Sequence, residues 1–199
     1  MNDRDKLIGA ARALLMEDGY AAVTREAAAV RAGLDPVVAA PAFGSNADLV
    51  LAALNAHWAE VKAFFEGAFS RRLPPLERLR RFFEGTQTVQ DGAWSKTGCV
   101  VGCLLLRTGS SVPRSETRLR ARVTECFGEF QGYVESALRD AQEQGLIRRG
   151  DVPTMAWTLI HYVEGALGMA RIQNDTKSLK GMMERSLEFL GATPETLAR

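Results

Sequence analysis

Three cysteines and two histidines are the side chains of this 199-residue sequence best suited to nucleophilic, redox or metal chemistry. Cys99 and Cys103 are four residues apart, a spacing that would put both thiols on one face of a helix. A reactive thiol needs a nearby cation or a helix N-terminus to stabilise its thiolate, and Lys96 is close in sequence. Cys99 is therefore a candidate sensor of electrophiles or oxidants. The alternative is that both cysteines are small apolar residues of a buried helix.

Motifs for catalysis or metal binding are missing from the sequence. The histidines, His57 and His161, are far apart, so no zinc spacing is present. There is no glycine-rich phosphate loop, no Gly-x-Ser-x-Gly nucleophile motif and no visible pair of carboxylates or catalytic triad. We therefore predict a protein that is not an enzyme and that uses no cofactor and no metal.

Cysteine usage and hydropathy indicate where the protein works. An odd number of cysteines without a disulfide-like framework suits a reducing compartment. The sequence contains no run of 18 or more apolar residues, so no transmembrane helix is predicted. The N-terminus lacks the long apolar region of a signal peptide. We expect a cytoplasmic protein that does not bind membranes.

Residues 19–50 predict two short helices separated by a tight turn. Thr24 can cap the first helix, because its hydroxyl can accept a hydrogen bond from a backbone N–H of the first turn. Residues 25–32 are rich in alanine, the strongest helix former. Gly33 then supplies the positive φ that a chain leaving a helix commonly needs.

A second helix start follows at once. Asp35 is a capping acid and Pro36 suits the first helical position, so residues 37–42 form a short second helix. Ser45 begins a third helix, with Asp48 as a partner resembling a capping box. This order is a helix-turn-helix unit, whose second helix can enter the major groove of DNA.

The same stretch resembles the N-terminal DNA-binding region of TetR-type repressors. The residues that carry the resemblance are Gly19-Tyr20, Thr24, Ala32-Gly33, Phe43-Gly44-Ser45 and Leu49. The resemblance implies an all-α fold of about nine helices. It also implies an N-terminal three-helix helix-turn-helix head over residues 1–47 and a C-terminal body for ligand binding and dimerisation over residues 48–199.

The second helix departs from the pattern usual in that family, which has glycine at 37, threonine at 38, tyrosine at 40, histidine at 42 and lysine at 46. This chain has Val37, Val38, Ala40, Ala42 and Asn46. The methyl groups could touch thymine methyls but cannot form bidentate hydrogen bonds with bases. Pro41 should also shorten or distort the helix.

The candidate DNA-binding residues combine this helix with the polar residues around it. They are Thr24, Arg25, Arg31, Asp35, Val37, Val38, Ala39, Ala42 and Asn46. Arg25, Arg31 and Asn46 are the candidates for phosphate contacts. However, residues 1–50 carry five basic and seven acidic side chains, a balance of −2. This charge opposes DNA binding, because neutralisation of phosphates supplies most non-specific affinity.

Beyond the head, apolar periodicity predicts a series of helices. The predicted ranges are a first helix over 3–18, then helices over 45–71, 76–90, 98–106, 115–144, 151–173 and from Thr176 or Ser178 to 190. Asp91-Gly92 is expected to be a turn, residues 109–113 a loop, and the chain ends in a tail that contains Pro194.

Two sets of body residues are candidates for binding. Aromatic walls with a few polar groups are typical of an effector pocket. The pocket candidates are Trp58, Phe65, Phe82, Trp94, Cys99, Cys103, Trp157, His161 and Glu164. The last two helices could pair with the same two helices of a second chain. The interface candidates are Leu159, Val163, Ala166, Ala170, Met182, Met183 and Leu187. For each set, the alternative is that the residues only fill the core.

The body also resembles a TetR subgroup that includes sensors of small reactive or organic molecules. The residues concerned are Gly98-Cys99-x-x-Gly102, Leu146, Glu164-Gly165-Ala166 and Arg171. Together the resemblances imply a homodimeric, ligand-responsive transcriptional regulator, usually a repressor, whose partners are double-stranded operator DNA and a small-molecule effector. The alternative is a dimeric small-molecule or redox sensor that keeps the repressor fold but has lost ordinary DNA binding.

Overall fold

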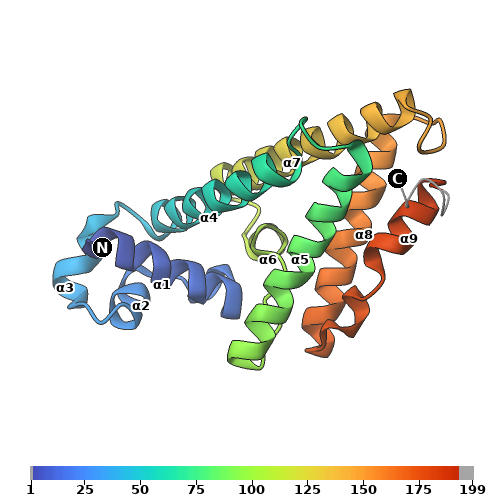
Figure 1. Cartoon of the computed structure of the whole chain (residues 1–199). Helices are drawn as coiled ribbons and strands as arrows, with labels where there is room; N and C mark the ends of the chain where they lie inside the picture. The colour runs from blue at the N-terminus through green and yellow to red at the C-terminus, as the bar shows by residue number, and fades with distance from the viewer. Residues whose placement is uncertain (1, 193–199) are drawn as a thin grey trace. The chain divides into compact units, whose positions relative to one another are not determined.

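A computed structural model of the chain describes residues 2–192, and these residues form nine α-helices and three short 3-10 helices, with no strand among them (Figure 1). The elements are α1 (Asp3–Asp18), η1 (Tyr20–Ala22), α2 (Arg25–Arg31), α3 (Pro36–Ala39), η2 (Ala40–Ala42), α4 (Asn46–Ala68), α5 (Pro75–Thr97), α6 (Leu104–Ser111), α7 (Thr117–Glu143), α8 (Val152–Gln173), η3 (Thr176–Leu179) and α9 (Met182–Phe189). The prediction of an all-α fold is confirmed.

The described residues form two compact units. Unit 1 contains the residues up to Lys62 together with Cys103–Phe127, and unit 2 contains Ala63–Gly102 together with the residues from Gly128 onwards. Helices α4 and α7 therefore contribute to both units, and α6 belongs to unit 1. The division at residue 47 that we expected between a head and a body follows a different line and stays a prediction.

Unit 1 is built on α1, whose apolar face is buried. Leu7, Ala11 and Leu15 are buried on α1, and Val23 and Ala28 pack in the same core. Helix α6 lies against α1 and η1 and holds them through polar contacts. The Tyr20 N–H donates to Ser111 Oγ (3.1 Å), and Arg107 donates to the Glu17 carbonyl (3.3 Å). The core of the head is therefore completed by a helix from much later in the chain.

His57 of α4 lies within unit 1 in a position that disfavours its charged form. Burial is the main cause that lowers the pKa of His57 to about 4; the neighbouring Arg12 contributes to the shift, and Glu60 opposes it. Arg12 and Glu60 form an ion pair at 2.7 Å. The imidazole is therefore neutral in the folded protein at neutral pH.

The core of unit 2 is an aromatic cluster with a buried ion pair at its edge. Phe65 packs on Phe130 in a tilted arrangement with ring centroids 4.8 Å apart and lies edge-on to Phe82 at 5.8 Å. Nearby, the buried Arg78 pairs with Asp140 at 2.5 Å and also donates to the Leu73 carbonyl at 2.9 Å. These contacts fix the start of α5 against α7.

Several sequence-based helix boundaries are confirmed. Helix α1 has the predicted range, Asp151 caps α8, and Ser45 Oγ accepts from the Asp48 N–H (3.1 Å) as expected of a capping pair. The long helices predicted over 45–71 and 115–144 are present with ends that differ by one to three residues.

The region between residues 91 and 111 was predicted wrongly. Helix α5 continues through Asp91-Gly92 to Thr97, because one glycine costs a helix only about 1 kcal/mol relative to alanine. It ends at Gly98, which has a left-handed φ of 67°. Residues 99–103 are not helical, and α6 begins at Leu104 and runs through most of the segment predicted to be a loop.

The last predicted helix is also divided. Gly181, with φ of 69°, separates η3 from α9. The chain after residue 192, including the predicted tail with Pro194, lies outside the described residues.

Candidate DNA-binding head and effector-binding unit

Residues Pro36–Ala42, which we call the recognition segment, have the local structure expected from their sequence. Thr24 Oγ1 accepts from the Ala27 N–H (2.9 Å), and Gly33 turns the chain with φ of 69°. Asp35 caps the segment by accepting from the Val37 N–H (2.9 Å). As predicted from Pro41, the α-helix is short: it ends at Ala39 and continues as a single 3-10 turn.

The recognition segment exposes some of its side chains and buries others. Val37 is 83% exposed, Val38 is 77% exposed, and Ala42 is also exposed. Ala39 is buried, with 8% exposed. The prediction that Ala39 contacts DNA is therefore wrong, because that methyl group packs against the head itself.

The two arginines predicted to contact phosphates are committed to contacts within unit 1. The Arg25 guanidinium donates to the Phe43 carbonyl (2.9 Å), while the Arg25 N–H donates to Asn46 Oδ1 (3.0 Å). Arg31 donates to both oxygens of Glu17 (2.7 and 2.6 Å). Arg25 and Asn46 thus join the recognition segment to α4, and the charge of Arg31 is neutralised.

Other cations of unit 1 are also engaged. The Arg4 guanidinium lies 4.7 Å from the centre of the Phe43 ring, and Arg118 pairs with Asp48 at 2.9 Å. The hydrogen bond from Ser45 lowers the pKa of Asp48 most, and Arg118 lowers it further. The surface near the recognition segment therefore offers little uncompensated positive charge to a phosphate backbone.

A hollow of about 340 Å³ lies beside the exposed Val37. Its lining residues are Arg25, Glu26, Pro36, Val37, Ala40 and Pro41. Its walls are mainly apolar, and Glu26 is an exposed acid at this surface.

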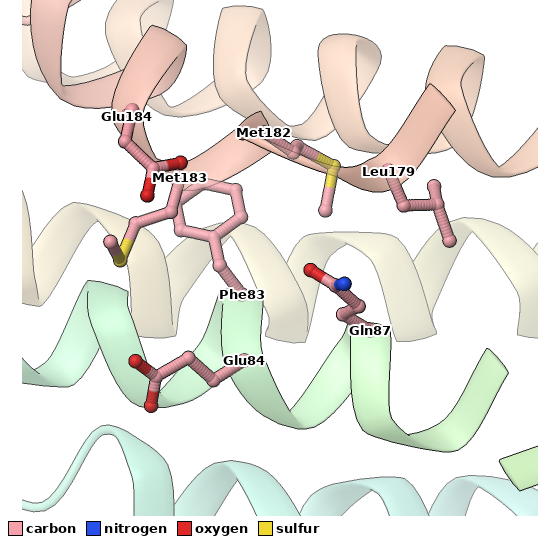
Figure 2. Close-up of a pocket in the computed structure, with 8 residues that line it drawn as sticks. Phe83, Glu84, Gln87, Leu179, Met182, Met183 and Glu184 are labelled. Atoms are coloured by element: carbon pink, nitrogen blue, oxygen red, sulfur yellow. The ribbon is translucent and has the colours of Figure 1, made fainter. Parts of the chain in front are cut away.

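Unit 2 contains a small pocket of about 110 Å³ between α5 and the segment that joins η3 to α9. Figure 2 shows Phe83 and Gln87 pointing from α5 toward Leu179, Met182 and Met183. Glu84 and Glu184 also line it. Ligand pockets usually measure about 300–1,000 Å³, so this pocket fits one small group rather than a drug-sized molecule. Sequence reasoning missed it, because its lining comes from two stretches, residues 83–87 and 179–184, that lie far apart in the sequence.

The residues predicted to line one pocket are found in several places. Trp58 is buried in unit 1, while Phe65 and Phe82 fill the aromatic core of unit 2. Trp157 and His161 stack on each other at the surface of α8, with centroids 5.5 Å apart, and Glu164 is buried. None of these side chains lines either of the two pockets described above, and the single effector pocket stays a prediction.

Cys99 lies in a loop that polar side chains hold in place, and Trp94 lies near the end of α5, just before that loop. We call Gly98–Gly102 the clamped loop. The side chain of Gln90 on α5 donates to the Gly102 carbonyl (3.0 Å) and accepts from the Gly102 N–H (2.9 Å). The Asn174 side chain, between α8 and η3, donates to the Gly98 carbonyl (2.7 Å) and accepts from the Val100 N–H (3.0 Å). Arg171 of α8 donates to the Val101 carbonyl (2.8 Å). The Trp94 indole donates to the Asn174 carbonyl (3.3 Å).

The three cysteines lie at three depths. Cys99 is exposed in the clamped loop, Cys103 is half-buried, and Cys126 is fully buried. Cys103 caps α6, since its Sγ accepts from the Leu106 N–H (3.5 Å). The prediction that Cys99 and Cys103 share one helix face is wrong, because the chain between them is not helical.

The predicted dimer residues are mostly core. Leu159, Val163, Ala170, Met182 and Leu187 are buried, so they close unit 2 rather than face a partner. Ala166 and Met183 are half-buried.

Another face of α8 is exposed instead. Along it lie His161, Gly165, Met169 and Ile172, spaced by three or four residues as on one side of a helix, and Ile172 is 78% exposed. We call this the α8 face. The spacing of these residues can be seen in the sequence, but the neighbouring face of α8 is more hydrophobic, and the interface was predicted on that face.

Within residues 2–192 no single helix is long and apolar enough to cross a membrane. One bent pair, Pro36–Ala42 followed by Asn46–Ala68 across a 69° bend, passes that test of length and composition when taken together. In the same residues, no group of three or more His, Cys, Asp or Glu side chains is placed to hold a metal ion.

A short helix-turn-helix joined to further helices is the architecture of a class of DNA-binding regulators. A family model described as the C-terminal domain of tetracyclin repressor-like proteins matches residues 75–185. The chain belongs to the TetR family of transcriptional regulators. The further resemblance of residues 98–102 to a sensor subgroup stays a prediction.

Solved structures share the fold at low sequence identity. A TetR-family regulator from Agrobacterium tumefaciens is 21% identical, with a TM-score of 0.83, and the match covers 94% of this chain and 97% of that one. The reduced form of NemR from E. coli is 17% identical, with a TM-score of 0.80 and coverage of 98% and 100%. FadR from Bacillus subtilis, in complex with stearoyl-CoA, is 16% identical, with a TM-score of 0.73 and coverage of 94% and 96%. No curated protein sequence matches this chain.

Proposed function

We propose that this TetR-family regulator is a homodimeric, ligand-responsive repressor that binds operator DNA through its recognition segment. The observation that carries the proposal is the exposed pair Val37 and Val38, set at the start of the second helix of a correctly capped helix-turn-helix. Nothing within unit 1 needs these side chains, and exposed valines of this kind are placed to meet a partner surface.

We propose that two copies pair through the α8 face. The exposed Gly165 and the half-buried Gly168 would allow close approach of two helices, since a Cβ built at either glycine meets no atom within 4 Å. Met169 and Ile172 add apolar surface that a partner copy would cover. A two-fold dimer would present two recognition segments to half-sites roughly 34–36 Å apart.

The effector would act in unit 2 and change the head through α6. The chain passes directly from the clamped loop into α6, and α6 bonds the end of α1 through Ser111 and Arg107. An effector that moves the clamped loop would therefore shift α6 and the turn at Tyr20. By population shift, it would favour a dimer whose two heads no longer match the half-sites. The small pocket beside Met182 can anchor one group of such an effector.

A second function has one observation in its favour. The engaged arginines and the charge balance of −2 over residues 1–50 suit a protein that senses a small molecule or oxidant but no longer binds DNA. In that case the recognition segment would contact another protein.

The test is selection of bound duplexes from a random DNA library by the full-length protein at low salt, with its oligomeric state measured in parallel. Enrichment of a two-fold symmetric sequence by a dimer supports the proposal. An intact dimer that enriches no sequence rejects the first function and favours the second.

A further inference from the structure

We infer that the recognition segment reads methyl groups in the major groove, so that thymines at the contacted positions define the operator half-site. The inference rests on the proposed function, because it names the DNA feature that the same surface recognises.

The segment offers only one means of recognising a base. Every side chain of residues 36–42 is proline, valine or alanine, so none can donate or accept a hydrogen bond. Bases in the major groove are distinguished by hydrogen bonds or by apolar contact with the C5 methyl group of thymine. For Val37 and Val38, the two most exposed side chains of the segment, only the methyl contact remains.

The backbone does not replace the missing side-chain donors. Pro36 and Pro41 have no N–H. The Val37 N–H donates to the Asp35 carboxylate, and the N–H groups of Val38 and Ala39 donate to the Asp35 carbonyl (3.2 and 2.8 Å). The donors of the first turn are therefore used within the protein.

The surface beside Val37 also excludes the commonest alternative. Recognition of guanine normally uses an arginine or lysine that donates to O6 and N7. The one arginine lining the adjacent hollow, Arg25, is bonded to the Phe43 carbonyl, and the exposed Glu26 is an acceptor. This surface has apolar walls that suit a methyl group and an acid that repels guanine O6 and N7.

The experiment measures the affinity of the full-length protein for an enriched duplex in which single thymines are replaced by deoxyuridine. Deoxyuridine keeps the hydrogen-bonding groups of thymine and removes only the methyl group. At the contacted thymine we expect affinity to fall about fourfold, the effect of one buried carbon group. Replacement in both half-sites should cost about 16-fold, because two identical contacts are lost. Conversely, 5-methylcytosine at that position should bind about fourfold more tightly than cytosine.

A protein variant assigns the effect to the segment. Val37→Ala removes methyl groups from an exposed position, so folding is unaffected, and the ratio between thymine and deoxyuridine should fall to below about twofold. Val89→Ala is the matched control, since Val89 is a valine of α5 in unit 2 that is 61% exposed. That variant should keep the wild-type ratio.

The outcomes separate this inference from the function on which it rests. If the protein enriches a DNA sequence but deoxyuridine changes affinity less than twofold at every position, methyl readout is overturned and the proposed function stands. If Val37→Ala keeps the full thymine preference, the contact belongs to another part of the protein and the assignment is overturned. If no sequence is enriched, both the function and the inference fail.

Discussion

The recognition segment and the clamped loop are both short, apolar stretches next to helix breakers, yet they adopt different structures. In the recognition segment, Asp35 and Pro36 start a helix whose backbone bonds are internal, and the valines remain exposed. In the clamped loop, side chains of Gln90, Asn174 and Arg171 take the backbone groups, and no helix forms.

An apolar run therefore does not fix its own secondary structure. Buried backbone groups must be bonded, but the partner can come from the next turn of a helix or from a distant side chain. Where a local cap is present, as at residue 35, the sequence is informative. Where the partner lies more than 70 residues away, as Asn174 does for Val100, it is not.

The largest expected effect tests the clamped loop. Gln90→Ala leaves the N–H and carbonyl of Gly102 without their partner, and we expect the free energy of unfolding to fall by about 3 kcal/mol. Urea denaturation at fixed protein concentration measures it. Gln87→Ala on the same helix is the control and should change stability by less than about 0.5 kcal/mol. If the free energy of unfolding fell equally in the two variants, the hydrogen bonds of Gln90 with Gly102 would not contribute specifically to stability.

A pH series tests His57, a half-buried residue of unit 1. The pKa of His57 is about 4 in the folded protein, below the ordinary histidine value of 6.5. Between these values the unfolded chain binds more protons than the folded one, so stability is present above pH 6.5 and is lost as the pH falls toward 4. The loss should be about 2–3 kcal/mol.

The variant His57→Gln should lose this pH dependence of the free energy of unfolding, measured by urea denaturation between pH 7 and pH 4.5. The wild-type protein, measured at the same protein concentration, is the reference. An unchanged pH dependence in His57→Gln would show that another group causes it.

A smaller effect tests the local cap of the recognition segment. Asp35→Ala removes the acceptor for the Val37 N–H and should cost about 1 kcal/mol in thermal or urea unfolding. Asp35→Asn keeps an acceptor and should cost less than half as much. If both variants lose the same amount, the charge of Asp35 rather than its cap supports the segment.

The smallest effect on stability tests why the head carries so little free positive charge. Glu17→Gln removes the carboxylate that neutralises Arg31, and the exposed pair should contribute less than about 1 kcal/mol to stability. Binding to DNA should become more salt-dependent, by about 0.9 in the slope of log affinity against log salt for each head. Glu143→Gln makes the same charge change in unit 2 and should leave the slope unaltered. A slope that stays at the wild-type value in Glu17→Gln would mean that Arg31 does not reach phosphate.

The sequence predicted the fold well where signals are local. The caps at Thr24, Asp35 and Asp151 and the effect of Pro41 were all readable, because each acts on the next few residues. The secondary structure of residues 91–111 could not be predicted from the sequence, since it depends on side chains from α8 and on glycine conformation.

The candidate sites were less predictable than the fold. Residue type indicated that Arg25 could contact phosphate, but only the folded head shows its guanidinium bonded to the turn at Phe43. Likewise, Leu159 and Ile172 are both apolar residues of α8, and their sequence does not tell which of them is buried and which is exposed.

The three cysteines differ in solvent exposure, so the native chain can be labelled selectively with a fluorescent dye. Cys99 is exposed while Cys103 is half-buried and Cys126 is inaccessible, so a thiol-directed dye added in substoichiometric amount will attach first at the clamped loop. Effector titrations can then be followed by emission from that position without introducing any new residue.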